Sequence, residues 1–369
     1  MKTTKILTAV AMSLLLTACG KSDPIPMFVG TYTDKGSEGI YSFSFDQESG
    51  KASAQHVAKV ANPSYLVIAA NDSFMYCVSE GKGEEATVSA YRVSPSSGRM
   101  AFLNRVLAHG DDPCHLVTYA RNLYVANYSS GNISVYDIER DATLFDNGET
   151  MQFDNGTFGD STRQSGSHIH QVVKSPDGHF LFATDLGGDC LYKYELRPEF
   201  KQGEPFKIDL PKGCGPRHLA FSPDSKHAYV VTELSDEVIA FDFDEATGNL
   251  VQKQAVKASD AGARGGAEVE VSPDGKHLYA SVRLKNDGIA IFSINADGTL
   301  KKTGYQPTGK HPRMFKITPN GKYVVVGCMD DDVLQVYERN AETGELKNTG
   351  NDIKVGKPAC IVFGDKVPW

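Results

Sequence analysis

Two positions of a repeating sequence pattern carry most of the side chains that suit acid–base chemistry and anion binding. The first position lies five residues before the Ser, Thr or Ala that opens a recurring turn motif. The second lies at the end of the strand that follows this turn. The set comprises His170, Arg217 and Arg313 at the first position, Glu80, Glu233 and Arg283 at the second, and His115 beside a related Pro-Cys pair.

These residue types predict an anion pocket that contains a general base. Planar guanidinium groups bind carboxylate or phosphate through two parallel hydrogen bonds. Among the residues at the two repeat positions, His170 is the one whose ordinary pKa suits proton transfer near neutral pH. The alternative is a water-filled channel in which Arg and Glu only neutralise each other, because buried Arg requires partners in any case.

Metal and cofactor sites are not predicted. His168 and His170 lie two residues apart and would face the same side of a strand, but no third ligand is fixed nearby, since Asp177 belongs to the turn motif. A Gly-x-Ser-x-Gly nucleophile elbow and a Gly-x-Gly-x-x-Gly dinucleotide motif are also absent from the sequence. We therefore expect chemistry without a metal ion or a cofactor.

Short strands in a repeat of about fifty residues must position these side chains. Segments such as Arg217-His-Leu-Ala-Phe-Ser-Pro-Asp combine an alternating strand with a turn, and a more apolar strand follows. A third strand comes next, so each unit has the length of one four-stranded blade. The units open at Asn62, Asp112, His168, Gly215, Gly266, His311 and Lys357.

The two ends of the chain complete each other. The last unit stops after one strand, at Phe363, and the segment from Met27 supplies strands with no first strand before them. We predict an all-β fold, a seven-bladed β-propeller whose closing blade is shared between the N- and C-termini, which leaves no unpaired edge. Both repeat positions should then open on one face of a central channel. The longest irregular stretch is expected at Glu139 to Ser167, as a functional or mobile loop.

The composition excludes several classes of protein. The chain has 369 residues and a formal charge of -8, which argues against a nucleic-acid partner. With 40% hydrophobic residues, disorder is not expected.

The N-terminus predicts export. Lys2 and Lys5 precede an apolar run, Ile6 to Leu16, which is too short to span a bilayer. We assign residues 1–18 to a lipoprotein-type signal peptide, 19–26 to a linker and 27–369 to one propeller domain. Leu16-Thr-Ala-Cys19 resembles a lipobox, so Cys19 would carry a lipid anchor as the only contact with a membrane. A plain secretory signal is the alternative.

Six further cysteines, from Cys77 to Cys360, form no Cys-x-x-Cys pair. Most of them lie in apolar, strand-like runs. Buried free thiols are therefore expected rather than disulfides or a zinc site.

Short motifs, in order along nearly all of the chain after the export signal, resemble the lactonase family of seven-bladed propellers. They include Gly30-Thr-Tyr-Thr33, Asn62-Pro-Ser-Tyr-Leu66, Pro113-Cys-His-Leu116, Gly166-Ser-His-Ile-His-Gln-Val172, Gly215-Pro-Arg-His-Leu219, Glu233-Leu-Ser235 and Pro312-Arg-Met-Phe315. One motif departs from the family, because Ser281-Val-Arg-Leu284 stands where the family usually shows Ser-Asn-Arg-Gly. This departure leaves the shape of the rim and the identity of the substrate open.

The resemblance implies a lactone hydrolase that opens an anionic sugar lactone, such as 6-phosphogluconolactone or a related aldonolactone. The family's proposed active site carries over onto His170, Arg217, Glu233 and Arg283 as catalytic residues. Substrate contacts are expected from Arg313, Glu80 and His115. The alternatives are a non-catalytic ligand- or protein-binding propeller and a muconate-type enzyme that forms lactones, as in the related fungal carboxymuconate cyclase.

Overall fold

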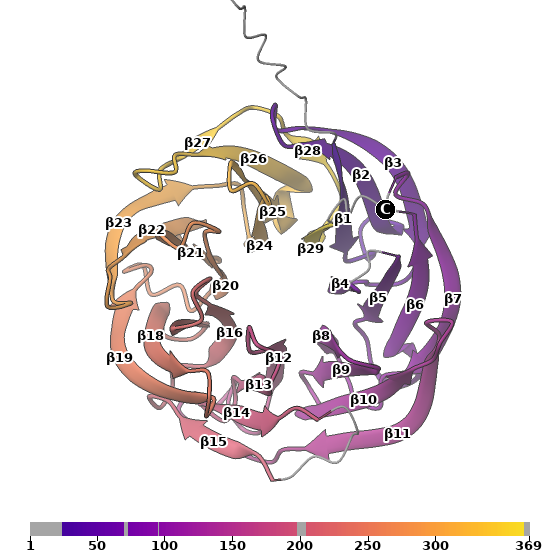
Figure 1. The fold of residues 1–369 in the computed structure, drawn as a ribbon, viewed down its shortest axis with the longest axis horizontal. Coiled ribbons are helices and arrows are strands. Elements are labelled where there is room, and N and C mark those ends of the chain that lie inside the picture. Colours follow the sequence, from indigo (N-terminus) through magenta and orange to yellow (C-terminus); the bar gives the residue numbers. More distant parts are fainter. Residues whose placement is uncertain (1–23, 70–72, 95, 198–203, 365–369) are drawn as a thin grey trace, which may run out of the picture.

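The computed structural model describes residues 24–69, 73–94, 96–197 and 204–364, so the predicted signal peptide and Cys19 lie outside the described residues. Seven sheets form a ring around a central axis (Figure 1). Within the described ranges the helices are two short 3-10 segments, Gly83–Glu85 and Met329–Asp331, and none is long and apolar enough to cross a membrane. The predicted all-β, seven-bladed propeller is confirmed.

Six blades follow the chain in order, each with its first strand nearest the axis. The first three contain β4 (Leu66–Ile68), β5 (Phe74–Ser79), β6 (Thr87–Val93) and β7 (Met100–Leu107); β8 (Pro113–Tyr119), β9 (Asn122–Asn127), β10 (Asn132–Ile138) and β11 (Leu144–Gln152); and β12 (Ile169–Lys174), β13 (Phe180–Asp185), β14 (Cys190–Glu195) and β15 (Phe206–Asp209). The next three contain β16 (Pro216–Phe221), β17 (His227–Thr232), β18 (Glu237–Asp244) and β19 (Asn249–Lys257); β20 (Gly266–Val271), β21 (His277–Val282), β22 (Gly288–Ile294) and β23 (Leu300–Pro307); and β24 (Pro312–Ile317), β25 (Tyr323–Cys328), β26 (Val333–Arg339) and β27 (Leu346–Asn348), with β28 (Ile353–Lys354) also paired to β26.

The closing blade joins the two ends of the chain, as the sequence predicts. Its order is β29 (Pro358–Phe363), β1 (Ile25–Thr31), β2 (Gly39–Asp46) and β3 (Lys51–Lys59). β1 and β29 run antiparallel, with Met27 opposite Phe363. The strand begins at Ile25, two residues before the predicted domain boundary at Met27, because Ile25 is buried and pairs with Phe45.

Hydrophobic clusters fill the spaces between neighbouring blades. Each of seven clusters among the described residues draws its buried side chains mainly from two adjacent blades. Tyrosines in the second strands add hydrogen bonds from one blade to a turn of the next. The Tyr229 hydroxyl donates to Gly298 O at 3.0 Å and the Tyr279 hydroxyl to Gly344 O at 2.8 Å. Burial of apolar area and these bonds hold the ring closed.

The recurring Ser-Pro-Asp signature builds the turn between the first and second strands. In the blade that begins with β20, the Ser272 hydroxyl donates to Asp274 Oδ1 at 2.6 Å and accepts from the His277 amide at 3.0 Å. Ser222, Asp224 and His227 repeat this arrangement one blade earlier. The motif therefore specifies local geometry, and its side chains lie at the opposite end of the inner strands from the residues of interest.

The prediction of an irregular stretch from Glu139 to Ser167 is wrong in part. Residues Leu144–Gln152 form β11, the outermost strand of its blade. Most of its side chains are exposed, so the apolar alternation that marks a half-buried strand is missing from its sequence. Irregular backbone remains between β11 and β12.

Candidate functional site

The side chains at the two repeat positions come together at one mouth of the central channel, as predicted. The first position lies near the start of inner strands, and the second immediately follows the second strand of each blade. A cavity of about 240 Å³ opens between them. Its lining residues are Tyr32, Glu80, Cys114, Tyr128, Arg163, His170, Glu233, Arg283 and Arg313.

A β-bulge in the inner strand presents the side chain at the first position. In β12, Ile169 pairs with Asp185 and Gln171 with Thr184, so His170 has no partner across the ladder. Arg217 and Arg313 occupy the same place in β16 and β24. Because a bulge inserts one residue and bends the strand, it changes the direction of that side chain.

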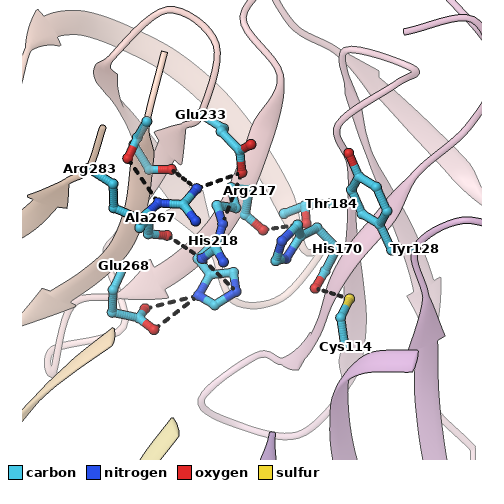
Figure 2. Close-up of polar contacts among 12 residues, drawn as sticks. Cys114, Tyr128, His170, Thr184, Arg217, His218, Glu233, Ala267, Glu268 and Arg283 are labelled. Carbon is cyan, nitrogen blue, oxygen red and sulfur yellow. Dashed lines mark hydrogen bonds and ion pairs between the residues drawn. The ribbon is translucent and has the colours of Figure 1, made fainter. Parts of the chain in front are cut away.

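Neighbouring blades satisfy the backbone carbonyls at these bulges. His170 O accepts from Cys114 Sγ at 3.3 Å, and Arg217 O accepts from the Thr184 hydroxyl at 2.7 Å (Figure 2). Ala267 O, in the wider bulge of β20, accepts from Arg217 Nη1 at 2.7 Å. These bonds cross from blade to blade, so they fix the bulged residues relative to one another.

Glu233 joins three arginines at the edge of the cavity. Its Oε1 lies 2.7 Å from Arg163 Nη2, and its Oε2 lies 3.1 Å from both Arg217 Nε and Arg283 Nη2. Burial by itself raises the pKa of Glu233, but the charges of Arg283, Arg217 and Arg163 outweigh it and lower this pKa to about 2. The carboxylate is therefore ionised at every physiological pH.

Arg313 has a different environment, beside Tyr32 and Glu80. Its guanidinium carbon lies 5.4 Å from the centre of the Tyr32 ring, a cation–π distance. Tyr32 donates its hydroxyl hydrogen to Glu80 Oε2 at 2.8 Å. Among the residues that the structure describes, Arg313 makes no hydrogen bond to an acceptor, so its donors remain available to a bound molecule.

His170 is buried and has a neutral imidazole. Desolvation lowers its pKa well below the usual value, and the positive charges of Arg217, Arg313 and Arg283 and the neighbouring His218 lower it further. Its Nδ1 has no hydrogen-bond partner within the described part of the chain. A neutral ring can accept a proton, and a bound anion nearby would raise its pKa again.

Arg217 and His115 are brought to the site but do not line the cavity. Arg217 is buried between Glu233, Ala267 O and His218, as Figure 2 shows. His115 packs against Tyr65, with ring centres 3.9 Å apart, and 5.4 Å from His218. Both therefore lie in a second polar layer beside the cavity.

The site residues predicted from the sequence do not include four that line the cavity, Tyr32, Cys114, Tyr128 and Arg163, or two of the second layer, His218 and Glu268. Tyr32 follows β1, the second strand of the closing blade, so it holds the same repeat position as Glu80 and Tyr128; extending the pattern across the chain ends would have found it. Arg163 belongs to the irregular segment and has no repeat equivalent. In the second layer, His218 Nδ1 lies 3.0 Å from Glu268 Oε1.

The candidate His168–His170 metal pair does not assemble. His168 Nδ1 lies 2.9 Å from Tyr128 O, and its ring stacks on Tyr128. Within the described residues, no group of three His, Cys, Asp or Glu side chains could hold a metal ion. All six described cysteines are buried and free, as predicted.

Known proteins share this architecture and sequence. The profile of the Lactonase family, described as a seven-bladed beta-propeller, matches residues 26–363. The chain is 34% identical to the 6-phosphogluconolactonase of Bacillus subtilis over 344 residues, which cover 91% of this chain and 97% of that protein.

Solved structures agree with this assignment. A Bacteroides uniformis protein provisionally assigned as a 6-phosphogluconolactonase is 45% identical, with a TM-score of 0.90 over 93% of this chain and 100% of that one. The periplasmic gluconolactonase of Pseudomonas aeruginosa is 32% identical, with a TM-score of 0.85 over 92% and 98% of the two chains. The chain therefore belongs to the lactonase family of seven-bladed β-propellers and is a hydrolase of the lactonase class.

Proposed function

We propose that this lactonase opens a sugar lactone that carries an anionic group, with His170 as the general base and without a metal ion. The observation that carries the proposal is the charge of the cavity. Arg163, Arg283 and Arg313 line it against only two carboxylates, Glu80 and Glu233. A net positive cavity that also holds a neutral imidazole suits an anionic ester substrate.

The reaction follows from the positions of His170 and Arg313. Their strands, β12 and β24, lie on opposite sides of the ring axis, so a lactone in the cavity would sit between them (Figure 1). His170 takes a proton from water as the water oxygen attacks the lactone carbonyl carbon. The available donors of Arg313 stabilise the oxyanion that forms. The ring C–O bond then breaks, and the leaving oxygen takes the proton from His170.

The depressed pKa of His170 fits this sequence of steps. The ring is neutral before the substrate arrives, so it is ready to accept a proton. An anionic substrate adds negative charge nearby and raises the pKa of His170, which strengthens it as a base. The site is therefore activated by the class of substrate that its arginines select.

Arg217, Arg283 and Glu233 form the support of the site in this proposal. Arg283 donates hydrogen bonds from Nε to Gly265 O and from Nη2 to Gly266 O, and Arg217 donates from Nη1 to Ala267 O. Most of their donors are therefore occupied by protein acceptors. They hold Glu233 in place and supply positive charge beside the cavity.

Hydrolysis assays test this function. The purified protein is mixed with 6-phosphogluconolactone and with gluconolactone, and acid release is corrected for spontaneous ring opening. His170→Ala should abolish turnover and leave the affinity for the product acid within about threefold, because binding rests on the arginines. No rate above background on either lactone, or a His170→Ala variant as fast as the parent, would overturn the proposal.

We further propose that the protein is exported and anchored through Cys19. Leu16-Thr-Ala-Cys19 supports this, and a structural relative is a periplasmic gluconolactonase. An exported protein would meet lactones formed outside the cytoplasm, which leaves an unphosphorylated acidic aldonolactone as a candidate substrate. The test is fractionation of cells that express the full chain or Cys19→Ser. The parent should sediment with membranes and dissolve in detergent, whereas sedimentation of both forms would contradict the anchor.

A further inference from the structure

The segment between β11 and β12 supplies Arg163 to the cavity from outside the repeat. Polar contacts tie this segment to the rest of the propeller. The Gln164 side-chain amide donates to Leu186 O at 2.8 Å and to Asp189 Oδ1 at 2.6 Å. Asp160 accepts from the Arg163 backbone amide at 2.9 Å and pairs with Arg264, in the connection between β19 and β20. These contacts fix the backbone of the segment that carries Arg163.

The guanidinium of Arg163 is only partly used by the protein. Nη2 makes both of its contacts, with the Tyr128 hydroxyl at 2.9 Å and Glu233 Oε1 at 2.7 Å. Within the described ranges of the chain, Nε and Nη1 have no acceptor. Tyr128 and Glu233 therefore hold the guanidinium in place through Nη2, and Nε and Nη1 can each donate a charge-assisted hydrogen bond to a phosphate or carboxylate.

Exposure distinguishes Arg163 from the two other arginines that contact Glu233. Its side chain is 38% exposed, compared with 3% for Arg217 and 6% for Arg283. Arg163 therefore lies at the entrance of the cavity, Arg283 lies in its wall, and Arg217 lies behind the wall. A substituent far from the reacting ester of a bound lactone would reach this entrance.

We propose that Arg163 is the specificity-determining residue of this site and binds the anionic substituent of the lactone at the cavity entrance by charge-assisted hydrogen bonds from its available guanidinium donors. The assignment rests on the proposed function and names the group that selects the substrate. Arg313 keeps the role of stabilising the oxyanion that forms at the lactone carbonyl. The substrate class is a sugar lactone with a phosphate or carboxylate group away from the ring carbonyl.

The test compares an anionic with a neutral lactone. Arg163→Ala should lower kcat/KM for 6-phosphogluconolactone by about tenfold to a hundredfold, the range expected for charge-assisted hydrogen bonds. For gluconolactone the change should stay within about threefold. Arg163→Lys should restore part of the difference, because it keeps the charge and loses the rigid planar arrangement of donors. Equal losses on both lactones, or no loss on either, would overturn the assignment.

A matched control removes one positive charge elsewhere. Arg121 lies in the turn between β8 and β9, at the other end of the inner strand from the cavity, and Arg121→Ala should leave both rates unchanged. Circular dichroism of Arg163→Ala checks its fold, and Arg163→Gln serves as a second variant of similar length.

A binding measurement separates this assignment from the proposed function. Calorimetry with inorganic phosphate should show about tenfold weaker binding by Arg163→Ala than by the parent, whether or not either lactone is turned over. Equal affinity of both proteins for phosphate, or no binding by the parent, would overturn the role of Arg163. A parent that binds phosphate through Arg163 but hydrolyses neither lactone would overturn only the proposed function.

Discussion

The substitution Glu233→Gln tests the electrostatic core of the site. The carboxylate faces three guanidinium groups at 2.7 to 3.1 Å and is almost fully buried. Its pKa falls from 4.5 to about 2, a difference of about 3 kcal/mol in favour of the charged form at about 1.4 kcal/mol per unit. Glutamine keeps the shape and removes the charge, so it should lower the free energy of unfolding by about 3 kcal/mol at pH 7.

The loss should depend on pH in a defined direction. Because the pKa of Glu233 is lower in the folded protein, its stabilisation is complete above about pH 4.5, where the unfolded state is also ionised. It declines as the pH falls toward 2. The difference between parent and variant should therefore shrink from about 3 kcal/mol at pH 7 to about 1 kcal/mol at pH 3.

Urea unfolding followed by far-ultraviolet circular dichroism measures both values. Glu38→Gln is the matched control, because its carboxylate pairs with Lys59 at 2.6 Å on the surface, with side chains 52% and 81% exposed. Solvent screens such an exposed pair, so Glu38→Gln should unfold at nearly the same urea concentration as the parent. A Glu233→Gln protein as stable as the parent at pH 7, or a difference that does not change with pH, would refute the reasoning.

Three other substitutions test separate parts of the structure. Leu284, next to Arg283, has a φ of 77° and an exposed side chain. Leu284→Gly should therefore relieve backbone strain and raise the free energy of unfolding by up to about 1 kcal/mol; a lower melting temperature would contradict this. Burial raises the pKa of Glu268 from 4.5 to about 7, so the parent loses stability as the pH rises through this range. Glu268→Gln should therefore be about 3 kcal/mol more stable than the parent at pH 8 and equally stable near pH 4; parallel pH profiles of the two proteins would exclude this. Buried Arg339 donates hydrogen bonds to Asp274 at 2.7 Å, to the Tyr279 hydroxyl at 3.0 Å and to Gly321 O at 3.1 Å. Arg339→Met should therefore lower the free energy of unfolding in urea by about 3 kcal/mol. It should leave kcat/KM unchanged, because these contacts surround the turn at the end of β20 away from the cavity.

The sequence by itself determined the propeller, the number of blades and the closing of the ring. Each of these features rests on local signals that repeat: apolar alternation within strands, the Ser-Pro-Asp turn and the spacing of about fifty residues. The same periodicity placed His170, Arg217, Glu233, Arg283 and Arg313 at one end of the ring. A repeat fixes the relative position of equivalent residues, because every blade turns around the same axis.

Tertiary structure decided which of these residues face the cavity. Arg217 holds the bulge position but lies in the second layer, as does His115, which follows the bulge at Cys114. Tyr32 joins the cavity from the other end of the chain. The bulge that presents His170 appears only when the pairing of β12 with β13 is known. Register between strands depends on contacts across the sheet, so local sequence does not specify it.

The place of Arg163 in the site is the clearest feature that the sequence alone could not predict. It lies in a segment with no repeat, and its role depends on contacts with Glu233 and Tyr128, from two other blades. Its place is set by a loop that is held by Asp189 and Arg264, residues far away in the chain. Long-range packing of an irregular segment has no periodic signature, so only the folded structure brings this arginine to the entrance of the site.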